Sequence, residues 1–285
     1  MTQKKQVDIF HVGPEKTGTT WIYECLRDHP EICASIKDKT HYYDMHYHRG
    51  WEWYKSRFGE GFDTLKVFDP TPSYLHSKLA PRRIANDNPD AKIIITLRHP
   101  IERAFSHYWH SKKKFRYDYD FSEILKRYWL FQGWLEPGFY AEHIETYMNY
   151  FPKENILCLL FDDLEKDPAG FLRRICEFTD INPEYTPEII GTKVNEKKSR
   201  ESETKRSLRT VLDSLGLLGV ARTTMAIMRK TGLIKGDGPF RQHIEKLSHV
   251  DRSVINELNK ICMPEIERLE KLLDMDLTIW RRYDS

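Results

Sequence analysis

A short glycine-containing segment offers the clearest chemistry in the sequence. Residues 13–21 read GPEKTGTTW, with one lysine and three threonines between and around the two glycines. Where a strand passes through such a loop into a helix, backbone N–H groups converge on one point and the helix dipole adds partial positive charge. Glycines let the backbone approach a ligand, and threonine hydroxyls can donate hydrogen bonds. The segment predicts a phosphate-binding loop; the alternative interpretation is an ordinary tight turn.

The position of the lysine separates this loop from the loop that binds ATP in P-loop enzymes. That motif, GxxxxGK[ST], has lysine directly after the second glycine, where this sequence has Thr19. Lys16 lies inside the loop instead, so its ammonium is better placed to touch a bridging or transferring oxygen than to run along a triphosphate. A P-loop nucleotide kinase is therefore the rival interpretation, and tight binding of ATP would favour it.

A second pattern that could bind an anion follows an apolar run in the middle of the chain. Arg98 ends that run, and Ser106 comes eight residues later in the expected next helix. An arginine fork and a hydroxyl together can grip a dianionic phosphate. The alternative is that Arg98 pairs with a carboxylate and Ser106 is a small packing residue. We expect Arg103 to be structural, paired with Glu102 or Asp69.

Strand-like and helix-like patterns alternate along the chain, which predicts an α/β fold. Apolar runs indicate strands at residues 7–12, 66–69, 93–97 and 156–161. Helical patterns begin near residue 19 and after residue 100, and cover residues 79–86, 121–130, 140–150 and 168–178. Strands separated by helices form parallel sheets with right-handed crossovers. Ligands bind beyond the carboxyl ends of such strands, which is where both motifs lie.

The length of 285 residues suits a single domain. We expect that domain to span residues 1–285, with a core at about 7–180, a variable region at about 193–246 and a C-terminal helix at about 247–280. Residues 193–209 are polar and rich in charge, so we expect a mobile loop there. The oligomeric state is left open.

The composition excludes several classes of protein. Lys and Arg total 45 against 43 Asp and Glu, so no general affinity for nucleic acid is expected. No apolar run resembles a signal peptide or is long enough to span a bilayer. The five cysteines are odd in number and lack CxxC spacing, which favours reduced thiols and a cytoplasmic location.

Together, the two motifs resemble the nucleotide-binding motifs of the sulfotransferases that use 3′-phosphoadenylyl sulfate (PAPS). The loop resembles the one that holds the 5′-phosphosulfate, and residues 98–108, RHPIERAFSHY, resemble the 3′-phosphate motif. Residues 46–54 (HYHRGWEWY) and 69–74 (DPTPSY) resemble segments of heparan sulfate N- and 3-O-sulfotransferases. Residues 160–164 (LFDDL) are similar to a segment of bacterial carbohydrate sulfotransferases.

The resemblance implies a P-loop-type three-layer fold and a transferase with PAPS as its co-substrate. The residues implied for donor binding are Lys16, Thr17, Gly18, Thr19, Thr20, Arg98 and Ser106. In an in-line displacement Lys16 would stabilise the leaving group, and no metal is expected because a sulfuryl group carries less charge than a terminal phosphate. Aromatic residues gather at 42–54 and 128–140, which suits a glycan or glycolipid acceptor, although core packing explains many of them equally well.

Two positions depart from the family pattern. Lys39 stands where the family has the glutamate that deprotonates the acceptor, and Pro70 stands where it has a lysine. We take His41 as the first candidate for the base, because an imidazole titrates near neutrality; Asp38 is second and His110 third. The missing glutamate also allows a non-catalytic relative that binds the nucleotide without turning it over.

Overall fold

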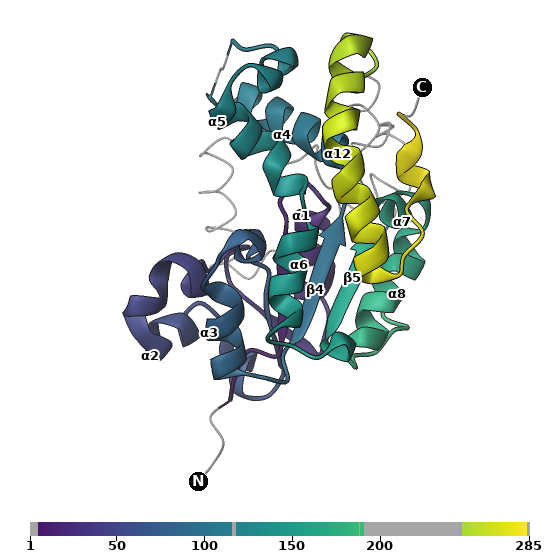
Figure 1. Ribbon diagram of the computed structural model, residues 1–285. Coiled ribbons are helices and arrows are strands. Elements are labelled where there is room, and N and C mark those ends of the chain that lie inside the picture. Colours follow the sequence, from purple (N-terminus) through teal and green to yellow (C-terminus); the bar gives the residue numbers. More distant parts are fainter. Residues whose placement is uncertain (1–4, 116–117, 188, 191–246, 284–285) are drawn as a thin grey trace, which may run out of the picture.

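Five parallel strands form the centre of the protein (Figure 1). The computed structural model describes residues 5–115, 118–187, 189–190 and 247–283. Its strands are β1 (Ile9–Gly13), β2 (Ile32–Ala34), β3 (Lys66–Asp69), β4 (Lys92–Leu97) and β5 (Ile156–Leu160). Their order in the sheet is β2-β3-β1-β4-β5, and every neighbouring pair is parallel. The predicted α/β fold with a parallel sheet is confirmed, although the sequence pattern missed β2.

Helices connect the strands and cover both faces of the sheet. The α-helices are α1 (Thr19–Arg27), α2 (Gly50–Lys55), α3 (Ala80–Asp87), α4 (Pro100–Phe115), α5 (Tyr128–Leu130), α6 (Ala141–Met148), α7 (Phe161–Lys166), α8 (Pro168–Phe178) and α12 (Arg252–Leu273). Short 3-10 or π helices lie at Tyr42–His46, Tyr47–Arg49, Glu60–Asp63, Pro72–His76, Phe121–Leu125, Phe131–Leu135, Glu136–Gly138, Lys153–Asn155 and Thr278–Arg281. The variable region expected at 193–246, with its loop, lies outside the described residues.

Two predicted helices differ from those observed. The helix expected at 121–130 is a 3-10 turn followed by one turn of α-helix. The helix expected at about 247–280 begins at Arg252, where the side chain of Asp251 accepts a hydrogen bond from the Ser253 amide at 2.8 Å. It ends at Leu273, because the next residue, Asp274, adopts a left-handed conformation.

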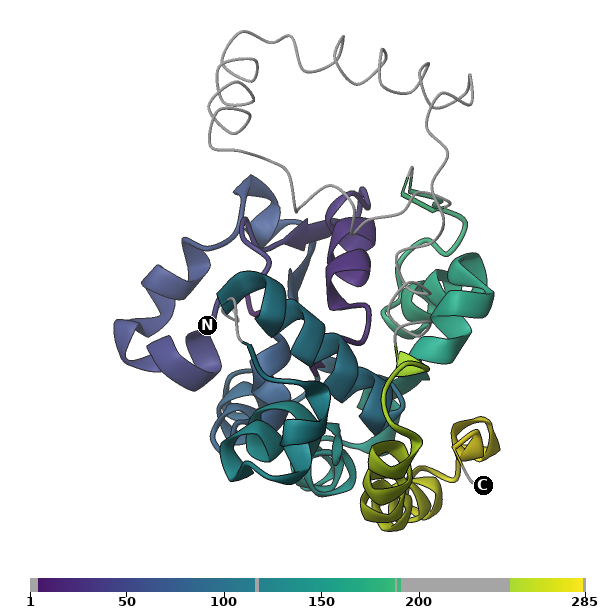
Figure 2. The ribbon, with the colours of Figure 1, turned by 90° about the horizontal axis from the view of Figure 1, so that it is seen from above.

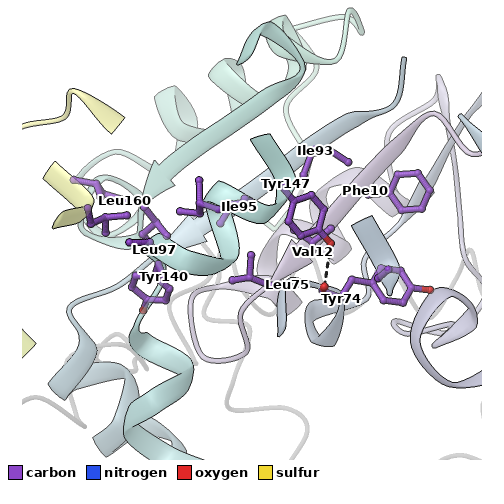
Figure 3. Packing of buried hydrophobic residues seen from close by; sticks show 14 of the residues in the cluster. Phe10, Val12, Tyr74, Leu75, Ile93, Ile95, Leu97, Tyr140, Tyr147 and Leu160 are labelled. Atoms are coloured by element: carbon purple, nitrogen blue, oxygen red, sulfur yellow. Dashed lines mark hydrogen bonds between the residues drawn. The ribbon is translucent and has the colours of Figure 1, made fainter. Parts of the chain in front are cut away.

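The alternation of side chains along the strands divides the core into two layers. Ile9 and Ile94 pack with α1 and α8 on one face. Phe10, Val12 and Ile95 point to the other face (Figure 3), and they belong to one core cluster with buried residues of α4, α6 and α12. Figure 2 shows α1 and α12 on opposite sides of the sheet. The three-layer arrangement excludes water from both faces of the sheet. The carboxyl ends of the strands are not covered by these layers, and polar groups lie there.

The carboxyl ends of β1, β3 and β4 meet at one edge of the sheet, because β1 lies between the other two. The chain leaves β1 at Gly13, which has φ +111°. A β-carbon there would collide with the backbone of Pro72, which follows β3. Glycine alone accepts both this conformation and this approach. The loop after β1 is thereby held against the segment after β3.

All five cysteines are unpaired, and four of them are buried: Cys25, Cys33, Cys176 and Cys262. Burial raises the pKa of the Cys176 thiol to about 11 and that of Cys262 to about 12. In the part of the chain that the structure describes, no helix is both long and apolar enough to cross a membrane.

Candidate active site

The predicted phosphate-binding loop joins β1 to α1. Gly18 occupies the N-cap position of α1 with φ 88°, and no side chain caps the helix there. The first amides of a helix have no partner within the helix, so an uncapped first turn can donate to an anion. Thr19 and Thr20 begin the helix and are half-buried. The geometry of the loop fits the predicted anion site.

The hydroxyl of Thr17 is turned into the protein rather than toward a ligand. It is fully buried, donates to the carbonyl oxygen of Pro14 at 2.7 Å and lies 2.6 Å from the hydroxyl of Thr96. The Thr96 hydroxyl in turn lies 3.0 Å from His11 Nε2. Thr17 therefore fixes the loop to β4, and only its backbone amide is left for the donor-binding role that the sequence predicted.

Lys16 lies at the centre of a group of cations. Its backbone is left-handed, with φ 76°, and its carbonyl oxygen accepts a hydrogen bond from Arg98 Nη1 at 3.4 Å. Burial lowers the pKa of the Lys16 ammonium to about 8; the carboxylate of Glu15 opposes this shift, while the charges of Lys39, Arg103 and Arg98 add to it. The ammonium thus lies where an additional negative charge would be strongly stabilised.

Arg98 follows β4 and is only 4% exposed. Its guanidinium stacks over the ring of Phe161 at 4.4 Å, and its Nε lies 3.6 Å from a carboxylate oxygen of Glu102. Nε makes no hydrogen bond to any described residue, so this ion pair holds the fork only weakly. Arg98 thus faces a carboxylate, as the alternative interpretation expected, and it also reaches the loop; its role in binding a phosphate stays a prediction. Ser106 lies half-buried further along α4, and its role stays a prediction.

Arg103 supports the loop from inside the protein. It is 1% exposed and donates to the carbonyl oxygens of Glu15, at 3.3 Å, and of Trp134. The predicted pairing with Glu102 or Asp69 is therefore wrong. Both terminal nitrogens of this guanidinium are bound by backbone carbonyl oxygens, one in the loop and one in the segment before α6, whereas Nε has no hydrogen-bond partner among the described residues.

An ion pair that the sequence analysis missed joins Lys39 to the loop. The Lys39 ammonium contacts the carboxylate of Glu15, and both side chains are partly exposed. Burial would raise the pKa of Glu15, but the charge and hydrogen bond of Lys39 outweigh it and lower this pKa to about 2. Lys39 thus holds an ionised carboxylate next to Lys16.

His41 is oriented by two neighbours. Its Nδ1 lies 3.2 Å from Asp44 Oδ2 and 3.1 Å from the hydroxyl of Ser73, which itself donates to Asp44 Oδ2 at 2.5 Å. The hydrogen bond to Asp44 raises the pKa of the imidazole, although burial acts against it. With Nδ1 directed at the carboxylate, Nε2 is the basic nitrogen of the neutral ring. A general base has this arrangement.

A buried carboxylate fixes the segment that carries His41. Asp69 is fully buried at the end of β3 and accepts hydrogen bonds from Thr40 and Tyr54, both at 2.7 Å, from Tyr74 at 3.1 Å and from Thr71 at 2.6 Å. Four hydroxyl donors thus stabilise one carboxylate. Because Thr40 is held in this network, the backbone that follows it is held as well.

The other predicted bases are less well supported. Asp38 is half-buried beside Lys39, and no geometry assigns it to the site. His110 is an exposed residue on α4. Its imidazole is still partly buried, and this partial burial, together with the charge of Lys16, lowers the pKa of the ring. One turn earlier, His107 carries a buried Nδ1 without a hydrogen-bond partner among the described residues, and burial lowers its pKa to about 4. The sequence analysis did not single out His107.

The aromatic residues divide into core and surface groups. Tyr42, Tyr43 and Tyr54 are buried, and the rings of Tyr42 and Tyr54 stack with centroids 4.1 Å apart. Core packing therefore explains these three, and they offer no free face to a sugar. Tyr128 and Trp129 are 73% and 49% exposed.

Among the residues with described positions, no group of three or more His, Cys, Asp or Glu side chains is arranged to hold a metal ion.

Comparisons with known proteins point to one family. The family model described as the sulfotransferase domain matches residues 6–216. Human heparan sulfate glucosamine 3-O-sulfotransferase 6 is 34% identical over 175 residues, which is 60% of this chain and 51% of that protein. Mouse bifunctional heparan sulfate N-deacetylase/N-sulfotransferase 4 is 31% identical over 194 residues, or 61% of this chain and 22% of that protein.

The fold has a solved counterpart. The crystal structure of a sulfotransferase from Alicyclobacillus acidocaldarius has a TM-score of 0.68 and 22% identity, covering 97% of this chain and 99% of that one. By contrast, the chain spans about half the length of the 3-O-sulfotransferase relative.

Proposed function

The chain belongs to the sulfotransferase domain family, and from this premise we propose that it transfers a sulfuryl group from PAPS to a hydroxyl or amine of a carbohydrate or glycolipid. The observation that carries the proposal is the contact between the two motifs: Arg98 Nη1 donates to the carbonyl oxygen of Lys16. One anionic ligand can therefore touch the loop and the arginine at the same time.

Donor binding uses groups that lie at the carboxyl ends of β1 and β4. The amides at the start of α1 and the ammonium of Lys16 hold the 5′-phosphosulfate, and Arg98 with Ser106 holds the 3′-phosphate. The first turn of α1, which no side chain of the described residues caps, supports the 5′ end of this fit. The 3′-phosphate distinguishes this donor from ATP, so the kinase alternative predicts the opposite preference among nucleotides.

The donor supplies an activated sulfur, and side chains of the protein accept the proton of the acceptor and stabilise the charge that develops. His41 Nε2 accepts the proton of the acceptor as the new bond to sulfur forms. The bond from sulfur to the bridging oxygen breaks, and its electron pair stays on that oxygen of adenosine 3′,5′-bisphosphate. Lys16 stabilises the charge that grows there, an interaction stronger in the transition state than before it.

The names of the relatives support the proposed acceptor class. Both relatives described above carry names that refer to heparan sulfate, and the name of the human protein also includes glucosamine, which supports a sugar acceptor here. The hydrogen bond between His41 and Asp44 favours a catalytic protein over a relative that only binds the nucleotide.

The five unpaired cysteines support the cytoplasm as the proposed location, which cell fractionation would test.

The test is transfer of label from ³⁵S-labelled PAPS to glucosamine-containing oligosaccharides and to glycolipids, with identification of the labelled product. Labelled product from the wild type, and about a hundredfold less, or lower, from Lys16→Met, is the expected result. We also expect transfer to persist in excess chelator, because no step uses a metal. Donor binding without transfer to any acceptor of the panel would favour the non-catalytic alternative, and a preference for ATP over PAPS would favour a kinase.

A further inference from the structure

The segment at residues 278–283 packs against the residues that hold Arg98, beside α7 (Figure 1). Trp280 is fully buried, and its indole N–H donates to Asp162 at 3.0 Å. His99, next to Arg98, accepts the Ile101 amide on Nδ1 at 3.2 Å. Its Nε2 therefore carries the proton and donates to the carbonyl oxygen of Trp280 at 3.0 Å. This segment is thus tied directly to the chain that follows β4.

Arg282 in this segment bridges two buried carboxylates. Its Nη2 lies 2.8 Å from Glu102 Oε1, and its Nη1 lies 3.0 Å from Asp162 Oδ1. The hydroxyl of Tyr283 donates to the same oxygen of Glu102 at 3.1 Å. The side chains of Glu102 and Asp162 are only 4% and 7% exposed, so water does little to stabilise their charges.

Glu102 thus lies near two arginines, but only Arg282 forms a close ion pair with it. Its Oε1 is bound by Arg282 and Tyr283, whereas its Oε2 is 3.6 Å from Nε of Arg98, too far for a hydrogen bond. A buried carboxylate that lost its close cation would take the nearest replacement, because an unpaired buried charge is strongly unfavourable. For Glu102 that replacement is Arg98, which is four residues earlier in the chain.

We propose that Arg282 is a positioning residue for the donor site: by binding Glu102, it keeps the fork of Arg98 available for the 3′-phosphate of the nucleotide. The inference rests on the proposed function, since it names what holds the arginine of that same site ready. Without Arg282, a two-point ion pair between Arg98 and Glu102 competes directly with the phosphate.

The experiment measures nucleotide affinity by isothermal titration calorimetry on the full chain. The ligands are adenosine 3′,5′-bisphosphate and adenosine 5′-monophosphate, which differ only in the 3′-phosphate. Arg282→Met, which keeps most of the apolar stem, is expected to weaken binding of the bisphosphate by about ten- to a hundredfold, the range of one charge-assisted hydrogen bond. Affinity for the monophosphate should stay close to that of the wild type.

Two further variants separate positioning from general support. Adding Glu102→Gln to Arg282→Met removes the competing charge and should restore much of the lost affinity. Arg281→Met is the matched control, because Arg281 lies in the same segment but pairs with Glu270 at 2.7 Å. This control should leave the ratio of the two affinities unchanged. Arg282→Lys keeps a cation but cannot bridge two carboxylates, so it should give an intermediate loss.

The outcomes are distinguishable. An equal loss for both nucleotides, or failure of Glu102→Gln to rescue, would show that Arg282 only supports the fold and would overturn the inference. Unchanged bisphosphate affinity in Arg282→Met would overturn it as well, while the proposed function would stand. A wild type that does not prefer the bisphosphate would contradict the proposed function itself, and the inference with it.

Discussion

The guanidinium of Arg98 donates a hydrogen bond of 3.4 Å to the carbonyl oxygen of Lys16. These two residues lie 82 positions apart in the sequence, at the ends of the adjacent strands β4 and β1. Their contact makes the two sequence motifs parts of one site, and the following predictions depend on it.

Replacing Lys16 should impair chemistry more than donor binding. Lys16→Met removes the ammonium that stabilises the departing oxygen, an interaction that gains strength in the transition state. We expect kcat to fall by about 100- to 1,000-fold, as for the loss of one preorganised electrostatic donor. A steady-state assay with labelled PAPS provides the test. A change confined to the KM for the donor would contradict the assigned role.

The rate of transfer should show a bell-shaped dependence on pH. His41 must be neutral to accept a proton, and the hydrogen bond to Asp44 raises its pKa above the usual value. Lys16 must be protonated, and burial lowers its pKa to about 8. Activity should therefore fall below a midpoint higher than that of a free imidazole, and also above about pH 8. Asp44→Asn should lower kcat and move the acid midpoint to lower pH, whereas an unmoved midpoint would exclude His41 as the base.

The ion pair between Glu15 and Lys39 should control the alkaline midpoint. The carboxylate of Glu15 raises the pKa of Lys16, and the charge of Lys39 lowers it. Glu15→Gln should therefore shift the alkaline midpoint to lower pH, and Lys39→Met should shift it to higher pH. Rate profiles of the two variants against the wild type make the comparison. The acid midpoint is an internal control for Glu15→Gln only, because the charge of Lys39 also acts on the pKa of His41. Shifts in the same direction would contradict this account.

The network around Asp69 should dominate local stability. Asp69→Ala leaves four hydroxyl donors of a buried site without their acceptor and should lower the free energy of unfolding by about 3 kcal/mol or more. Asp69→Asn keeps the shape and one acceptor oxygen, so its loss should be smaller. Urea unfolding measures both. A loss of less than about 1 kcal/mol in Asp69→Ala would show that the hydroxyls find other partners.

The sequence predicted the parts of the fold that carry a local signal. Residues 66–69 and 168–178 were predicted within the observed bounds of β3 and α8. Strand β2 was missed because its three residues are too few to show a period. The α/β class followed from the alternation of strands and helices, which needs no knowledge of tertiary contacts.

The site was only partly predictable, because its decisive contacts join distant segments. Lys16 and Arg98 could be identified from their places after two strands. The direction of the Thr17 hydroxyl could not be predicted from the sequence, because it depends on Thr96 in a neighbouring strand. The pairing of Lys39 with Glu15 likewise required the fold. Asp44, by contrast, is three residues from His41, and that spacing is a signal that could have been used.

The central claim is that Lys16 and Arg98 hold opposite ends of one doubly phosphorylated adenosine. The most direct test is the ratio of the affinities for adenosine 3′,5′-bisphosphate and adenosine 5′-monophosphate, measured by calorimetry in the wild type, Arg98→Met and Lys16→Met. We predict a wild-type preference for the bisphosphate of about ten- to a hundredfold, lost in Arg98→Met and kept in Lys16→Met. Equal affinities in the wild type, or a preference that survives Arg98→Met, would contradict the claim.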